Sequence, residues 1–205
     1  MLRTSQTWTS QNTEMKPNEV LSCRRVALLI IDMINTFDFP QGADLARLAL
    51  PVAKKIQKLK VRLRKHRIPV IYLNDNFGQW RSDWKEVFNL CTQSDCLGKD
   101  IAEILHPADD DFFILKPRHS GFFNTNLDVL LKELGVQKLI ITGVAGNICV
   151  LFTANDAHMR DFKVWIPQDC VASNTKKENV GALTQMKTVL DVSISASHEV
   201  RNSHI

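Results

Sequence analysis

The spacing of apolar residues changes along the chain. Some segments show the pattern typical of buried strands, and others show the 3.6-residue spacing typical of helices. Short continuous apolar runs predict strands covered on both faces, and they lie at 26–31, 69–73, 111–115, 138–141, 164–166 and 189–194. Apolar residues at helical spacing predict a long helix over 45–63 and shorter helices near 99–105, 126–134, 148–160 and 176–186. Pro51 is expected to kink the long helix or to divide it from a preceding turn.

This alternation, with connections too long for hairpins, predicts an α/β fold in which six strands form a mainly parallel, doubly wound sheet. The chain shows no internal repeat, low-complexity linker or second core, so residues 21–205 are expected to form a single domain. Residues 1–20 are polar and rich in Ser, Thr, Gln and Asn, and we expect them to be a flexible or partner-docked arm.

The composition favours a globular protein with one core and argues against a membrane-spanning or nucleic-acid-binding protein. With 205 residues and 44% hydrophobic content the chain can bury one full core, and no apolar stretch approaches the roughly 20 residues of a membrane span. The net charge of +4 is dispersed, and its densest cluster, 54–67, is interpreted as the solvated face of the long helix. We therefore expect no nucleic-acid and no membrane partner.

Cysteine usage points to the compartment. Five cysteines, an odd number, and a first segment without the apolar centre of a secretion signal favour reduced thiols and a cytoplasmic location. Cys91 and Cys96 could chelate a metal as a pair, but no second cysteine or histidine pair supports such a site.

Three chemically potent residues fall at predicted strand ends. Asp32 ends the first strand, Lys116 ends the third, and Cys149 follows the fourth. In open parallel sheets ligands bind beyond the carboxyl ends of the strands, where the strand order reverses. The coincidence of an acid, an ammonium and a thiol there predicts a site, although each alone would be an ordinary turn, solvated or core residue.

Cys149 is expected in the first turn of a helix that opens directly off the sheet. Unpaired amides and the positive end of the helix dipole favour a thiolate there. Such surroundings can lower a cysteine pKa from about 8.5 to roughly 3.5–7.5, which would make Cys149 a nucleophile at neutral pH. The alternative from position alone is a packed core thiol.

Several motifs together resemble the isochorismatase-like superfamily of cysteine hydrolases, which includes nicotinamidases and N-carbamoyl amidases. The matching segments are ALLIIDMINTF at 27–37, KPRHSGFFNT at 116–125 and TGVAGNICV at 142–150, with a weaker match of QDCVAS at 168–173. They stand in the family's order with similar gaps and cover about residues 25–185.

The resemblance implies a three-layer α/β/α fold and a catalytic triad of Asp32, Lys116 and Cys149. It further implies an oxyanion hole formed by the backbone amides of Ala145 and Cys149, with a non-proline cis peptide between Val144 and Ala145. Because family members are usually dimers or tetramers, a homo-oligomer is expected.

The chain departs from metal-binding relatives after the second strand. Those relatives carry an aspartate and two histidines there, whereas residues 74–80 read NDNFGQW. Asp75 alone cannot supply the three protein ligands of a zinc-type centre, so we predict no catalytic metal and no cofactor, and nicotinamidase activity becomes less expected.

The pocket walls are less well determined by the sequence. The candidate substrate-binding residues are Phe37, Phe122, Trp80 and Trp84, which follow catalytic strands or lie in loops at that end of the sheet. His119 could touch a substrate and Arg118 could pair with an acidic one, whereas His158 is expected outside the pocket.

The sequence thus favours a metal-independent cysteine hydrolase that cleaves a C–N bond of a small amide, ureido or carbamoyl compound through a thioester. Two alternatives stay open: vinyl-ether cleavage of the isochorismatase type, which needs no nucleophilic thiol, and a non-catalytic binding protein on the same fold. A nucleotide-binding domain finds no support, because the loops after the first and fourth strands lack glycine-rich phosphate-binding spacing.

Overall fold

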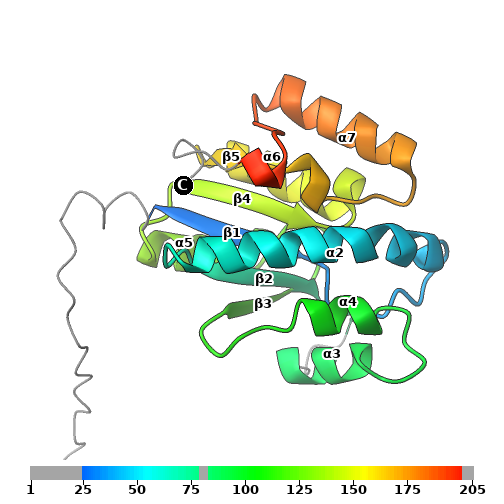
Figure 1. Ribbon diagram of the computed structural model, residues 1–205. Coiled ribbons are helices and arrows are strands. Elements are labelled where there is room, and N and C mark those ends of the chain that lie inside the picture. The colour runs from blue at the N-terminus through cyan, green and yellow to red at the C-terminus, as the bar shows by residue number, and fades with distance from the viewer. Residues whose placement is uncertain (1–24, 79–82, 200–205) are drawn as a thin grey trace, which may run out of the picture.

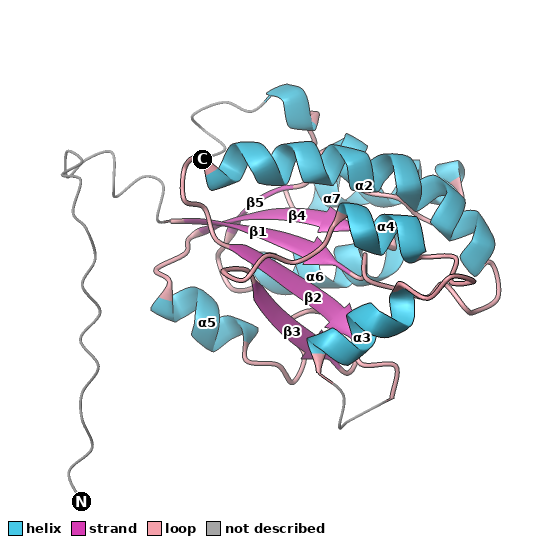
Figure 2. Cartoon of the chain, turned by 60° about the horizontal axis from the view of Figure 1, so that its bottom comes forward, coloured by secondary structure: helices cyan, strands magenta, loops and turns pink. Residues whose placement is uncertain are grey.

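Five parallel strands form the central sheet of the protein. The computed structural model describes residues 25–78 and 83–199, so the arm predicted for 1–20 lies outside the described residues. The strand order is β3-β2-β1-β4-β5, as Figure 2 shows. The strands are β1 (Val26–Ile31), β2 (Val70–Asp75), β3 (Phe112–Lys116), β4 (Lys138–Gly143) and β5 (Lys163–Trp165).

Helices cover both faces of this sheet and give three layers (Figure 1). One face packs against α2 (Gly42–Arg64), α3 (Trp84–Cys91) and α4 (Lys99–Ile104). The other packs against α5 (Leu127–Glu133), α6 (Leu151–His158) and α7 (Lys176–Val189). The α/β/α architecture expected from the sequence is therefore confirmed.

The sixth predicted strand, 189–194, is wrong. Val189 still belongs to α7, and Asp191 adopts a left-handed φ of 51°, which interrupts an extended backbone. The backbone of the segment pairs with the sheet at an isolated parallel bridge between Trp165 and Ser193, and no ladder is formed in the described residues.

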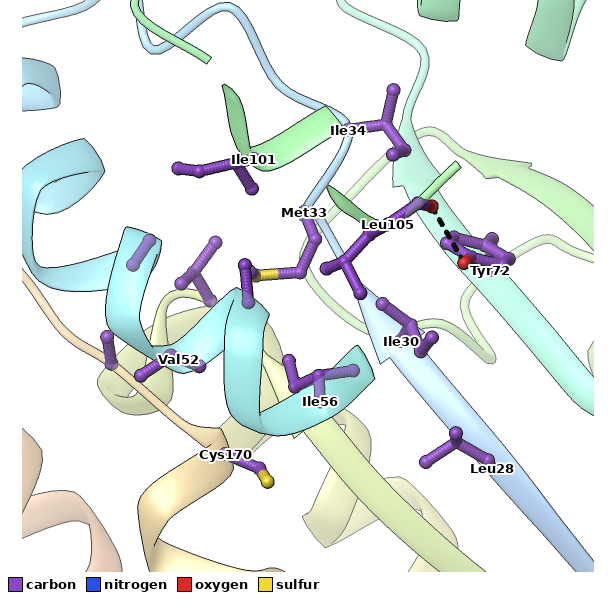
Figure 3. Packing of buried hydrophobic residues seen from close by; sticks show 14 of the residues in the cluster. Leu28, Ile30, Met33, Ile34, Val52, Ile56, Tyr72, Ile101, Leu105 and Cys170 are labelled. Carbon is purple, nitrogen blue, oxygen red and sulfur yellow. Dashed lines mark hydrogen bonds between the residues drawn. The ribbon is translucent and has the colours of Figure 1, made fainter. Parts of the chain in front are cut away.

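Helix α2 carries much of the core on its side of the sheet. Figure 3 shows Val52 and Ile56 of α2 in one cluster with Leu28 and Ile30 of β1 and with Met33 just beyond it. The helix runs without interruption through Pro51, so the proline does not divide it from a preceding turn. The 54–67 cluster is also not solvated throughout, because Lys60 is buried.

Helix α3 was not predicted, although its start carries a recognisable signal. The side chain of Asp83 accepts hydrogen bonds from the amides of Lys85 and Glu86, as an N-cap residue does. The spacing of Asp83 and Glu86 is that of a capping box, which marks helix starts in sequences. No helix in the described ranges is both long and apolar enough to span a bilayer.

Candidate active site

The carboxyl ends of β1, β3 and β4 bring the three predicted residues together. Asp32 directly follows β1, and Lys116 is the last residue of β3. Cys149 lies in η1 (Gly146–Val150), a single π-helical turn between β4 and α6. The connections reverse direction between the neighbours β1 and β4, so the site lies where open α/β sheets bind ligands.

Lys116 contacts both of its predicted partners. Its Nζ lies 2.8 Å from Oδ2 of Asp32 and 3.5 Å from Sγ of Cys149. Asp32 and Cys149 lie close enough that each shifts the pKa of the other. Lys116 is fully buried, whereas Cys149 keeps 9% of its surface exposed. Asp32 keeps 5%, so Cys149 is the most exposed residue of the three.

Backbone groups hold the acid and the ammonium in place. The amide of Asp75 donates a 2.8 Å hydrogen bond to Oδ1 of Asp32, which leaves Oδ2 for Lys116. Nζ of Lys116 also donates to the carbonyl of Arg118 at 3.2 Å, and a carboxylate oxygen of Asp75 lies 4.0 Å away. The geometry is thus fixed from the ends of both β2 and β3.

Burial and neighbouring charge shift the pKa values of Asp32 and Lys116. Burial raises the pKa of Asp32 above its ordinary value, although the Lys116 ammonium opposes the shift. Burial alone would lower the pKa of Lys116, but the neighbouring Asp32 carboxylate and Cys149 sulfur raise it. The site therefore combines an aspartate of increased basicity with a lysine that stays charged.

The expected low pKa of Cys149 is wrong. Burial and the adjacent Asp32 carboxylate raise the pKa of the thiol, and the Lys116 ammonium only partly offsets them. The first helical turn does not outweigh the loss of solvation at this depth. The raised pKa favours the protonated thiol of Cys149 over the thiolate.

The turn before Cys149 has the unusual backbone that the resemblance implies. The peptide bond between Val144 and Ala145 is cis. Gly143 has a φ of 116°, and a Cβ there would lie 2.1 Å from the carbonyl oxygen of Ile31. Only glycine therefore lets the end of β4 approach β1 so closely.

Within the described part of the chain, the amides of Ala145 and Cys149 donate no hydrogen bond to a backbone group outside this turn. The other amides are occupied. Gly146 donates to the carbonyl of Ala172, Asn147 donates to Oγ of Ser173, and Ile148 and Val150 donate to the carbonyl of Ala145. Ala145 and Cys149 therefore stay the predicted donors of the oxyanion hole.

The four candidate pocket residues lie in different surroundings. Phe37 and Phe122 are buried in the two hydrophobic clusters, on opposite faces of the sheet. Trp84 begins α3 and packs against Phe113, with ring centroids 5.9 Å apart. Trp80 lies outside the described residues. Contact of any of the four with a substrate stays a prediction.

A cavity of about 370 Å³ is lined by Asp75, Asn76, Gly78, Pro117, Arg118, Phe123 and Asn124, of which Asp75 contacts Asp32 and Arg118 contacts Lys116. Sequence reasoning named only Asp75 and Arg118 of this set. Phe123 is 49% exposed and directly follows the candidate substrate-binding residue Phe122. A larger cavity of about 630 Å³ lies near Gln137 and Lys163, at the amino ends of β4 and β5, away from the triad.

His119 contacts the nucleophile, which the sequence did not predict. Its Nδ1 lies 3.9 Å from Sγ of Cys149, and the residue is exposed. No group of three or more His, Cys, Asp or Glu side chains within residues 25–78 and 83–199 is arranged to hold a metal ion.

Comparison with known proteins places this geometry in a family. The model of the isochorismatase domain matches residues 26–197. The uncharacterized isochorismatase family protein YaaI of Bacillus subtilis strain 168 is 47% identical over 174 residues, covering 85% of this chain and 95% of that protein. Ureidoacrylate amidohydrolase RutB of Serratia proteamaculans strain 568 is 30% identical over 164 residues, covering 68% of this chain and 66% of that protein.

A solved structure agrees with this assignment at the level of the fold. N-carbamoylsarcosine amidase from Thermoplasma acidophilum superposes with a TM-score of 0.68 at 24% identity, over 86% of this chain and 99% of that one. The family match includes all three strand ends that carry the acid, the ammonium and the sulfur. The chain belongs to the isochorismatase family and is a hydrolase related to amidohydrolases.

Proposed function

We propose that the protein is a metal-independent cysteine hydrolase that cleaves a C–N bond of a small amide, ureido or carbamoyl compound through a thioester. One observation carries the proposal: the Lys116 ammonium contacts both the Asp32 carboxylate and the Cys149 sulfur, and Asp32 and Cys149 keep some exposed surface whereas Lys116 keeps none. A nucleophile, a base and a cation are thereby within bonding distance of one another.

The first step joins the sulfur to the carbonyl carbon. Because burial raises the pKa of Cys149, the thiol gives its proton to Asp32 as the S–C bond forms. Asp32 is suited to accept it, since burial raises the pKa of that carboxyl too. Lys116 stays charged and stabilises the negative charge on either partner as the proton moves.

The amides of Ala145 and Cys149, which donate to no backbone group outside the turn in the described structure, are suited to bind the oxyanion of the tetrahedral intermediate. When the intermediate collapses, the C–N bond breaks and Asp32 returns its proton to the leaving amine. Water then attacks the thioester and gives a proton to Asp32, the C–S bond breaks, and the proton passes back to the sulfur. Atoms and charges balance, and no metal takes part.

The similarity to relatives supports the C–N bond as the target. A relative at 30% identity is named for ureidoacrylate amidohydrolysis, and a ureido group is an amide-like carbonyl flanked by nitrogen. The Cys149 thiol contacting a base favours acyl transfer over vinyl-ether cleavage, which needs no nucleophile.

The test is release of ammonia or amine from a panel of small amides, ureido and carbamoyl compounds. We expect turnover that survives a chelator and falls on the order of 10⁴-fold or more in Cys149→Ser, because a unit of catalytic residues fails when its nucleophile is lost. The matched control is Cys96→Ser, at a half-buried cysteine outside the triad, which should retain the activity.

Two outcomes would contradict the proposal. Turnover abolished by the chelator would show that a metal is required. Turnover of a vinyl ether that persists in Cys149→Ser, without amide cleavage by the wild type, would favour the isochorismatase-type reaction instead.

A further inference from the structure

His119 approaches the sulfur from the solvent side of the site. Its Nδ1 lies 3.9 Å from Sγ of Cys149, a separation at which the large sulfur atom still accepts a hydrogen bond. The ring packs against Phe152 on the first turn of α6, with centroids 5.4 Å apart. This contact orients the imidazole although the residue is exposed.

The chain on both sides of His119 is fixed to the catalytic elements. On one side, the carbonyl of Arg118 accepts a hydrogen bond from Nζ of Lys116. On the other side, Oγ of Ser120 donates to the carboxylate of Asp156 on α6. The position of the imidazole is therefore coupled to the triad and to the helix that follows the nucleophile.

A buried hydroxyl ties the same loop to the nucleophile's own backbone. Oγ1 of Thr153 accepts from the amide of Gly121 at 3.0 Å and donates to the carbonyl of Cys149 at 2.7 Å. Thr153 has no exposed surface. Because the loop and the sulfur share this anchor, the approach of His119 to Cys149 is a built feature and not the chance position of a surface side chain.

We propose that His119 is a further catalytic residue, whose Nδ1–H donates a hydrogen bond to the Cys149 sulfur whenever that sulfur carries negative charge. This inference rests on the proposed function. The thiol proton still goes to Asp32, and the imidazole keeps its own proton. The same hydrogen bond stabilises the sulfur when the thioester C–S bond breaks.

The charges around the sulfur explain why a second donor is useful. Asp32, from the end of β1, opposes a negative sulfur, and Lys116, from β3, lies closer to that carboxylate than to the sulfur. A carboxylate oxygen of Asp75, from β2, also lies 4.0 Å from the Lys116 ammonium. Phe152, the α6 residue that packs against His119, carries no charge. His119 is the donor that does not share its hydrogen bond with a carboxylate in the described structure.

The test measures how fast iodoacetamide alkylates Cys149, followed by peptide mass spectrometry, because this reaction uses the thiolate and needs no substrate. His119→Leu removes the donor without blocking access, and we expect alkylation about tenfold slower at neutral pH, as for a lost hydrogen bond to a charged group. His119→Asn, which keeps a donor near the Nδ1 position, should recover part of the rate. His158→Asn, on the exposed last turn of α6, is the control and should match the wild type.

An unchanged rate in His119→Leu, or a rate in His119→Asn no faster than in His119→Leu, would overturn the assignment. With a substrate from the amide panel, His119→Leu should lower kcat about tenfold with little change in KM, which a merely structural role would not produce. Slowed alkylation in a protein that cleaves no member of the panel would leave the sulfur contact standing and sink the hydrolase proposal alone.

Discussion

Two buried lysines, each paired with a buried aspartate, stand at different ends of the molecule and differ in what surrounds them. Lys116 lies 2.8 Å from Asp32 at the carboxyl edge of the sheet. Lys60, on α2, lies 2.6 Å from Asp111, which directly precedes β3 and so belongs to the amino edge. Burial and pairing with an aspartate therefore do not by themselves mark a lysine as catalytic.

The partners make the difference. Lys60 donates to the hydroxyl of Tyr72 and the carbonyl of His106, and Asp111 is also bound by Arg64. Tyr72 in turn donates to the carbonyl of Leu105, the contact drawn as a dashed line in Figure 3. Each polar group of this Lys60 network is paired with another protein group, and none of them is a nucleophile. The network therefore links α2 to β2 and to the start of β3.

Lys116 instead shares its charge between a base and a sulfur that solvent can reach. The pKa directions follow from this contrast. Burial lowers the pKa of Lys60 despite Asp111, whereas the Asp32 carboxylate and the Cys149 sulfur raise the pKa of Lys116. The lesson is that a buried ion pair becomes a candidate site when a reactive group and access are added to it.

The largest expected effect breaks the pair at the carboxyl edge. Lys116→Met should lower kcat/KM about 10³-fold, because charge developing on the sulfur and on Asp32 loses its stabilising ammonium. Circular dichroism should show a folded protein. Lys132→Met, at an exposed lysine on α5, is the control. An active Lys116→Met enzyme would contradict the assigned role of this lysine.

Breaking the other pair should affect stability and leave activity intact. Lys60→Met leaves Asp111 buried with Arg64 and the amide of Ala108 as its partners, so we expect a loss of about 3 kcal/mol, the low end for a broken buried pair. Urea unfolding measures this loss, and kcat/KM at a temperature where the variant is folded should not change. A fall in kcat/KM there would mean that the Lys60 network communicates with the site.

Much of this contrast could be predicted from the sequence at one edge and little at the other. Asp32, Lys116 and Cys149 were found because parallel strands end at a common edge, and chain order alone then brings distant residues together. Lys60 was interpreted as a solvated residue, because helical spacing does not reveal that an aspartate 51 positions later returns to cover it. Contacts of that kind depend on how loops close.

The raised pKa of Cys149 and the contact between His119 and Cys149 were also not predictable from the sequence, because both depend on how distant segments pack. Position in a first helical turn indicates the sign of the dipole, but not the depth of burial or the distance to Asp32, and these decide the thiol pKa. The sixth strand failed because its alternating apolar residues, Leu190 and Val192, are buried without a strand ladder. In the segment 189–194 the alternation of apolar residues therefore predicted the burial of side chains correctly but the backbone hydrogen bonding incorrectly.

The smallest expected effect, in free energy, concerns the pH dependence at the carboxyl edge. Asp32 must be a carboxylate to accept the thiol proton, so kcat/KM should fall tenfold per pH unit below the pKa of Asp32. Because burial raises that pKa from its ordinary value of 3.8, the midpoint of this acid limb should lie above 3.8. The measurement is kcat/KM from neutral pH downward, with circular dichroism at each pH to exclude unfolding.

Two variants assign this acid limb to its group. Lys60→Met should keep the wild-type midpoint, since its network lies at the other edge of the sheet and shares no partner with Asp32 in the described structure. His119→Asn should also keep it, because the titrating group is the carboxyl and not the imidazole that touches the sulfur. If the acid limb disappears in His119→Asn, the general base would be the exposed histidine and not the buried aspartate. The ion pair of Lys116 would then be structural, like that of Lys60.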